Sequence, residues 1–192
     1  MEKAIAVGDR VKYYRKKRSM TIQQVAEAAG LSKGLISQIE NRLVSPPIAT
    51  LFKIANVLEV PMARFFQDEL SVSDKIVAVK ESERKKVNRR KLSGSMSLGY
   101  SYESLAWKKT KKSMEPFIIT FESKQADEVA YFSHQGEEFH FVLEGELEFL
   151  SDEKTVVLEK GDSLYFESNI SHGFRALNGK PAKTLVVIHS DY

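Results

Sequence analysis

The chain has no cysteine among its 192 residues, which excludes disulfide bonds and thiolate metal sites. It also has no apolar run long enough to cross a membrane. Residues 1–10 lack the apolar segment of a signal peptide. These absences predict a cytoplasmic protein with no membrane partner. The length allows either one large domain or two ordinary ones.

Negative charge is scarce in the first part of the chain, although the net charge is only +3. Residues 1–66 hold eleven Lys and Arg against five Asp and Glu, and residues 67–91 hold eight against five. Residues 92–192 are acidic, with ten against sixteen. A basic N-terminal part favours DNA as a partner, because contacts with phosphates release counterions. A solvated basic face would explain the counts alone.

Residues 21–41 form the clearest local pattern. Thr21 and Gln24 fit a capping box at the start of one helix, Gly30 fits its left-handed end, and Ser32 fits the cap of a second helix. Apolar spacing predicts three further helices, so the expected N-terminal domain has five helices. The other three are expected at residues 4–18, 48–58 and 61–66.

The second helix of this pair has one apolar and one polar face. The polar face consists of short donors and acceptors, which are suited to base edges and phosphates in a major groove. An amphipathic helical hairpin without a DNA role is the alternative. The polar residues are Lys33, Gly34, Ser37, Gln38 and Asn41.

The pattern R-x-x-R-x₅-T-x-x-x-x-A-x-x-x-G-x-S-x-x-x-I-S-x-I-E-N resembles the XRE, or lambda-repressor-like, helix-turn-helix family over residues 7–66. The resemblance implies that residues 32–41 are a recognition helix. Within this helix, Lys33, Gly34, Ser37 and Gln38 would read bases. Thr21, Gln23 and Asn41 would hold phosphates. It also implies a structural salt bridge between Arg15 and Glu40. Ile22 departs from the family, in which glutamine is frequent at this position.

From residue 97 onward the sequence predicts short strands separated by Gly, Asp and Asn turns, as in a β-sandwich or barrel. We therefore expect domains at 1–68 and 98–192, joined by residues 69–97 as a linker and first strand. The charged run 81–91 fits a solvated hairpin or an arm that touches DNA. The predicted strands are 97–107, 117–122, 138–143, 146–150, 155–158, 163–166 and 184–188, with a possible strand at 75–80.

Residues 132–145 and 161–178 resemble the two motifs of the cupin family. The first contains His134, Glu138 and Gly145, and the second contains Gly161-Asp162 and His172. The resemblance implies a double-stranded β-helix, or jelly-roll, over roughly residues 70–192.

Metal-binding cupins usually present three histidines and one glutamate, but Phe132 occupies the first histidine position here. The remaining His134, Glu138 and His172 suit a divalent ion such as Zn, Fe, Mn or Ni. Strand alternation places His140 on the face of Glu138, where it would complete the set. A polar pocket that binds only an organic ligand is equally compatible. The expected pocket also contains Phe132, Tyr165, Glu167 and Arg175, in which the acidic group suits a cation and Arg175 suits a carboxylate.

Together these patterns predict a transcriptional regulator rather than an enzyme. It would bind a palindromic operator in double-stranded DNA as a homodimer and sense a small-molecule effector with its cupin domain. The alternative is a cupin metalloenzyme, a dioxygenase or isomerase, fused to a DNA-binding head. Loss of the first histidine argues against it. A β domain that only dimerises is a third possibility.

Overall fold

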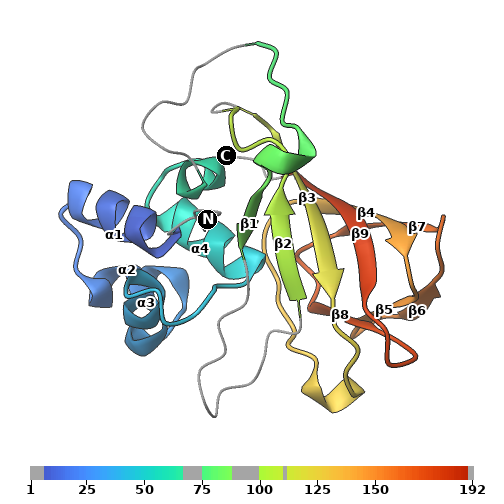
Figure 1. The fold of residues 1–192 in the computed structure, drawn as a ribbon. Coiled ribbons are helices and arrows are strands. Elements are labelled where there is room, and N and C mark those ends of the chain that lie inside the picture. The colour runs from blue at the N-terminus through green and yellow to red at the C-terminus, as the bar shows by residue number, and fades with distance from the viewer. Residues whose placement is uncertain (1–6, 67–74, 88–99, 110–111, 190–192) are drawn as a thin grey trace. The chain divides into compact units, whose positions relative to one another are not determined.

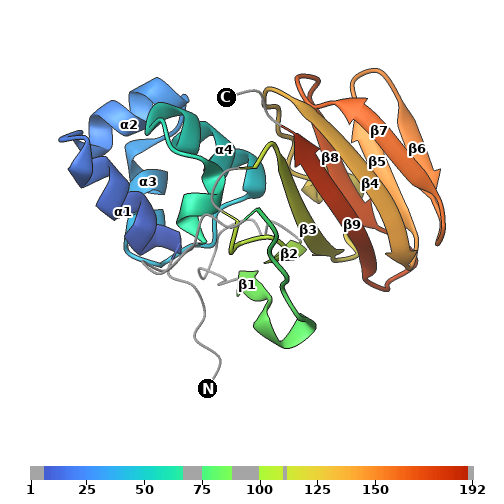
Figure 2. The same cartoon turned by 90° about the horizontal axis from the view of Figure 1, so that it is seen from above.

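The computed structural model describes residues 7–66, 75–87, 100–109 and 112–189. They divide into two compact units, one mainly helical and one formed by strands (Figures 1 and 2). Residues 100–106 and 112–189 form the strand unit, and residues 107–109 group with the helical unit. No helix in the described ranges is long and apolar enough to cross a membrane.

The helical unit contains α1 (Val7–Lys17), α2 (Ile22–Ala29), α3 (Lys33–Glu40) and α4 (Ile48–Val57). The prediction of five helices was wrong, because Met62–Phe65 forms a 3₁₀ helix, η1, instead of a fifth α-helix. Four residues are too few to offset the cost of nucleating an α-helix, so this segment closes i→i+3 bonds. One of these joins Arg64 N to Pro61 O at 2.9 Å.

The turn between α2 and α3 follows local rules. Thr21 and Gln24 form the predicted capping box, Gly30 ends α2 with φ = 64°, and Ser32 caps α3. The apolar sides of the helices then meet in one core. This core includes Val11, Val25, Ile36, Ile39, Leu51, Ile54, Phe65 and Phe66, each at most 1% exposed.

The possible strand at 75–80 does not form, and Ile76 is 88% exposed. A 3₁₀ helix, η2 (Glu81–Glu83), and a short strand, β1 (Lys85–Val87), follow instead. Trp107 holds this segment, since its Nε1 donates to Glu83 O at 2.9 Å and the Nζ of Lys85 lies 4.6 Å from its ring centre.

The strand unit has two sheets. In the larger one the strands of this unit lie in the order β2-β3-β9-β4-β7, all antiparallel (Figure 2). The smaller sheet has the order β6-β5-β8. The bounds are β2 Tyr100–Ser104, β3 Met114–Phe121, β4 Glu137–Glu144, β5 Leu147–Ser151, β6 Thr155–Leu158, β7 Ser163–Glu167, β8 His172–Ala176 and β9 Ala182–His189.

Alternation along β4 sets the face of each site residue. Glu138, His140 and Val142 are buried, whereas Phe139 and Phe141 are only half-buried. Aromatic side chains of the smaller sheet cover this inner face, as the ring of Phe174 on β8 stacks on His140 at 4.4 Å and 17°. The inner face of β4 therefore brings a carboxylate and an imidazole into a largely aromatic interior.

Candidate functional site

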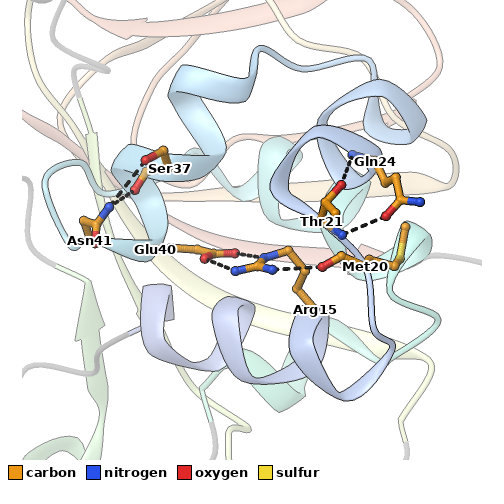
Figure 3. Close-up of polar contacts among 7 residues, drawn as sticks. All are labelled: Arg15, Met20, Thr21, Gln24, Ser37, Glu40 and Asn41. Atoms are coloured by element: carbon orange, nitrogen blue, oxygen red, sulfur yellow. Dashed lines mark hydrogen bonds and ion pairs between the residues drawn. The ribbon is translucent and has the colours of Figure 1, made fainter.

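The predicted DNA-reading residues lie at the exposed side and ends of α3. Ile36 and Ile39 bury the opposite side, with exposures of 0% and 1%. The exposed group comprises Lys33, Gly34, Gln38 and Asn41, while Ser37 is half-buried. Asn41 caps the helix, and its Nδ2 donates to Ser37 O at 2.9 Å (Figure 3).

Arg15 and Glu40 link α1 to the end of α3 (Figure 3). Arg15 Nε lies 2.6 Å from Glu40 Oε1, and Arg15 Nη2 lies 2.7 Å from Oε2. Arg15 Nη1 donates to Met20 O at 2.8 Å. The hydrogen bond with Glu40 raises the pKa of Arg15 although burial opposes it. This arrangement fixes α3 by its last turn.

The start of α2 also places polar groups at the surface. Thr21 Oγ1 accepts from Gln24 N at 3.1 Å, and Gln24 Oε1 accepts from Thr21 N at 2.8 Å (Figure 3). Gln23 is exposed, and its Nε2 donates to Glu27 Oε1 at 2.6 Å. Ile22, the residue that departs from the family, is half-buried.

In the strand unit, three imidazoles surround one buried carboxylate. His134 Nε2 lies 2.7 Å from Glu138 Oε1, His172 Nε2 lies 3.7 Å from the same oxygen, and His140 Nε2 lies 2.7 Å from Oε2. All four residues are at most 8% exposed. His134, Glu138 and His172 each offer a ligand atom within 4.8 Å of the others, which is the spacing of a potential metal centre.

The outer nitrogens of two histidines contact backbone carbonyls. His134 Nδ1 lies 3.1 Å from Gln135 O, and His172 Nδ1 lies 2.9 Å from Ile170 O. Donation at Nδ1 leaves the lone pair at Nε2, as in metal-ligating histidines. For His134 this sets an Nε2 lone pair against a carboxylate oxygen 2.7 Å away, so the contact needs a second proton or a cation. The residues present therefore fit a divalent ion.

Burial and hydrogen bonding act in opposite directions on Glu138. Burial would raise the pKa of its carboxyl, but the hydrogen bonds with His134 and His140 hold that pKa well below its usual value. Burial also lowers the pKa of His172, although the charge of Glu138 opposes this. Both shifts favour the protonation states that metal ligands require, an ionised carboxylate and a neutral imidazole.

Of the four residues expected around an effector, Phe132 lies beside the histidines and the other three do not. The backbone of Phe132 pairs with His172, with N–O distances of 2.8 and 2.9 Å. Tyr165 and Glu167 lie on the outer face of β7, opposite to buried Phe166. Arg175 alternates with Phe174 on β8 and contacts Glu148 Oε2 at 2.5 Å. Tyr165, Glu167 and Arg175 thus fall on the far side of their strands from the histidines, whereas the antiparallel pairing places Phe132 beside His172 on the same face.

The sequence analysis missed a buried ion pair in the same unit. Lys112 Nζ lies 3.0 Å from Glu115 Oε2, and the two side chains are 8% and 2% exposed. Register places Glu115 in one row with Ile188 and Glu138, so it faces the same interior. Strand alternation could have predicted this position, because Glu115 lies two residues before the buried Phe117 and so faces the same side of the strand.

Comparison with known proteins finds two families. A helix-turn-helix family matches residues 11–65, and the cupin domain family matches residues 117–188. The regulator PuuR of Escherichia coli is 25% identical over 90% of this chain and 89% of its own length. The regulator SinR of Bacillus subtilis is 30% identical over 57% of this chain and 97% of its own length. Both are described as HTH-type transcriptional regulators.

Solved structures extend the similarity over both units. The crystal structure of an HTH_3 family transcriptional regulator from Vibrio cholerae is 27% identical, with a TM-score of 0.68 over 98% of this chain and 97% of that chain. The crystal structure of FeII HppE is 24% identical, with a TM-score of 0.51 over 97% and 100%. The second likeness shows the fold alone.

Proposed function

Because the chain belongs to the XRE-type helix-turn-helix transcriptional regulators that carry a C-terminal cupin domain, we propose that it binds a palindromic operator as a homodimer and senses an effector in the cupin domain. The observation that carries the DNA part is the exposed polar side of α3. The opposite side of α3 is buried, and the ion pair between Arg15 and Glu40 holds the C-terminal end of the helix.

For DNA binding we assign two roles. Lys33, Gly34, Ser37 and Gln38 face the bases, since they lie along α3 from its N-terminal end. Thr21, Gln23 and Asn41 face phosphates, because they lie at the ends of the two helices. Phosphate contacts position a protein on DNA, and base contacts specify the sequence.

Dimerisation follows from the size of the DNA-binding unit. One small helix-turn-helix unit makes few contacts, so specific affinity requires two copies on half-sites about one helical turn apart. We assign the contact between copies to the cupin domain, where a sheet edge can pair with its twin. An effector would then change DNA affinity by altering the spacing or freedom of the two helical units, with a coupling of about 1–3 kcal/mol.

For the sensor we propose a divalent metal at His134, Glu138 and His172, with open positions for the effector. Two histidines and one carboxylate suit Fe, Mn, Ni or Zn, and such an ion polarises a bound oxygen or carboxylate of a ligand. The chain's own part is to hold the two imidazoles by their Nδ1 contacts and to exclude water with aromatic rings.

The metalloenzyme alternative shares this centre and differs in turnover. It is favoured only by the set of two histidines and one carboxylate, which also occurs in oxygenases. An enzyme would convert the small molecule to a product, whereas a sensor would bind and release it chemically unchanged. Mass spectrometry of candidate effectors after incubation with the metal-loaded protein separates the two functions.

The decisive experiment combines DNA selection with native mass spectrometry of the full chain. From a random DNA pool we expect enrichment of a palindrome, bound by two copies with one divalent ion each. Recovery of pools without sequence enrichment would overturn the proposed function. Enrichment of a site bound by one copy would overturn dimerisation alone.

A further inference from the structure

We propose that His140 is a positioning residue that holds the second oxygen of Glu138, and that it is not a ligand of the metal. The inference rests on the proposed metal centre at His134, Glu138 and His172. Of the four buried polar side chains, three would bind the ion, and the fourth, His140, would hold the carboxylate oxygen that does not face the ion.

The two oxygens of Glu138 have different surroundings. Oε1 lies near both His134 Nε2 and His172 Nε2, at 2.7 and 3.7 Å. Oε2 lies 2.7 Å from His140 Nε2. The ligand atoms that converge within 4.8 Å come from His134, Glu138 and His172, without His140. The carboxylate therefore has one oxygen toward the centre and one toward His140.

The outer nitrogens divide the histidines in the same way. His134 and His172 each have a backbone carbonyl at Nδ1, which leaves Nε2 free to bind an ion. His140 Nδ1 is buried and has no hydrogen-bond partner in the described part of the chain. With no acceptor at Nδ1, the ring proton belongs at Nε2, where Oε2 accepts it. A nitrogen that donates this proton is not available as a ligand.

Packing keeps the His140 ring in this role. The ring is 1% exposed, stacked on Phe174, and 5.9 Å from the ring of Phe166. Its place on β4, two residues after Glu138, fixes it beside the carboxylate on the same face. Such outer partners orient ligands, and their loss typically costs about 10–100-fold in metal affinity.

The first test uses the metal-free full chain and nitrogen-15 NMR of the histidine rings. We expect the Nε2–H form for His140 and the Nδ1–H form for His172. An Nδ1–H form for His140 would overturn the assignment whether or not the protein binds metal. Wild-type protein that takes up no divalent ion would instead overturn the metal centre, and with it the role of His140 toward a metal.

The second test counts imidazoles by pulsed electron paramagnetic resonance of the Cu(II)-loaded full chain. We expect two in wild type and two in His140→Gln, whose amide can still donate to Oε2. The His140→Phe variant removes the donor, and we expect it to bind Cu(II) about 10–100-fold more weakly. His189→Gln is the matched control and should change neither value, because His189 lies on the opposite face of β9 from Ile188, the partner of Glu138.

Loss of one imidazole in His140→Gln would identify His140 as a ligand and overturn the inference. Unchanged affinity in a folded His140→Phe would overturn it as well. If His140→Phe does not fold, the imidazole count in His140→Gln decides alone.

Discussion

Glu40, the last residue of α3, accepts hydrogen bonds from Arg15 on both of its carboxylate oxygens, although 25 residues separate the two in sequence. The side chains are 11% and 2% exposed. The pair therefore ties the last turn of α3 to α1 through a buried contact (Figure 3).

The first prediction concerns this pair. Glu40→Ala leaves the Arg15 guanidinium buried without its partner, so we expect the free energy of unfolding of the helical unit to fall by about 3 kcal/mol. Denaturant unfolding followed by circular dichroism measures it. Asp9→Ala is the control, because it removes the exposed partner of Arg42 and should leave the midpoint nearly unchanged. Equal losses in both variants would contradict the special role of the buried pair.

The second prediction separates base contacts from phosphate contacts. Gln38→Ala and Lys33→Ala should reduce discrimination between the selected operator and random DNA, because each removes a group facing the bases. Gln23→Ala should weaken binding to all sequences alike. Fluorescence anisotropy with both DNAs at one salt concentration gives the ratio of the affinity for the operator to the affinity for random DNA. The same loss on both DNAs in all three variants would refute the division of roles.

The third prediction uses Gly34, the second residue of α3. A Cβ at this position would have only Ser32 Oγ, at 3.9 Å, within contact range. Gly34→Ala should therefore leave the fold intact and raise the free energy of unfolding by up to about 1 kcal/mol. Operator affinity should nevertheless fall about tenfold, because the methyl group would stand between helix and DNA. A variant that is more stable and binds with full affinity would place Gly34 outside the interface.

The helix-turn-helix was predictable because its signals are local. A cap at Thr21, a left-handed glycine at Gly30 and a second cap at Ser32 each depend on neighbours within four residues. The 3₁₀ helix at Met62–Phe65 was not predicted, since apolar spacing over so few residues indicates a helix but does not distinguish the 3₁₀ type from the α type.

In the strand unit, the alternation of side chains along each strand predicted which residues face the interior. It placed His140 and Glu138 on one face and could have revealed Glu115. Assigning residues to the pocket because they are close to a motif in sequence was misleading. Tyr165 precedes the inward-facing Phe166, and Arg175 follows the inward-facing Phe174, so both face outward. Strand β8 was not predicted as such, since Gly173 and Arg175 obscure its strand pattern.

A fourth prediction concerns Gly173 on β8, next to His172. A Cβ there would lie 2.5 Å from Val129 Cγ1 and 3.0 Å from Ala130 O, so Gly173→Ala forces this neighbourhood to move. We expect a loss of about 1–3 kcal/mol in the unfolding free energy of the strand unit, and weaker metal binding through the displaced His172. Thermal unfolding with and without added metal measures both. An unchanged melting temperature would show that Val129 gives way freely.

The last prediction tests whether the metal centre acts on DNA binding or merely shares the chain with it. The double variant His134→Ala and His172→Ala removes two of the three proposed ligands, so metal analysis should find no stoichiometric divalent ion. Because these residues lie in the cupin unit, the effector-free variant should bind the selected operator as wild type does, and effector should no longer shift its affinity. His189→Ala should keep both the ion and the response. A double variant that retains a stoichiometric ion would place the metal elsewhere, and one that loses the ion but keeps the response would assign sensing to an organic pocket without metal.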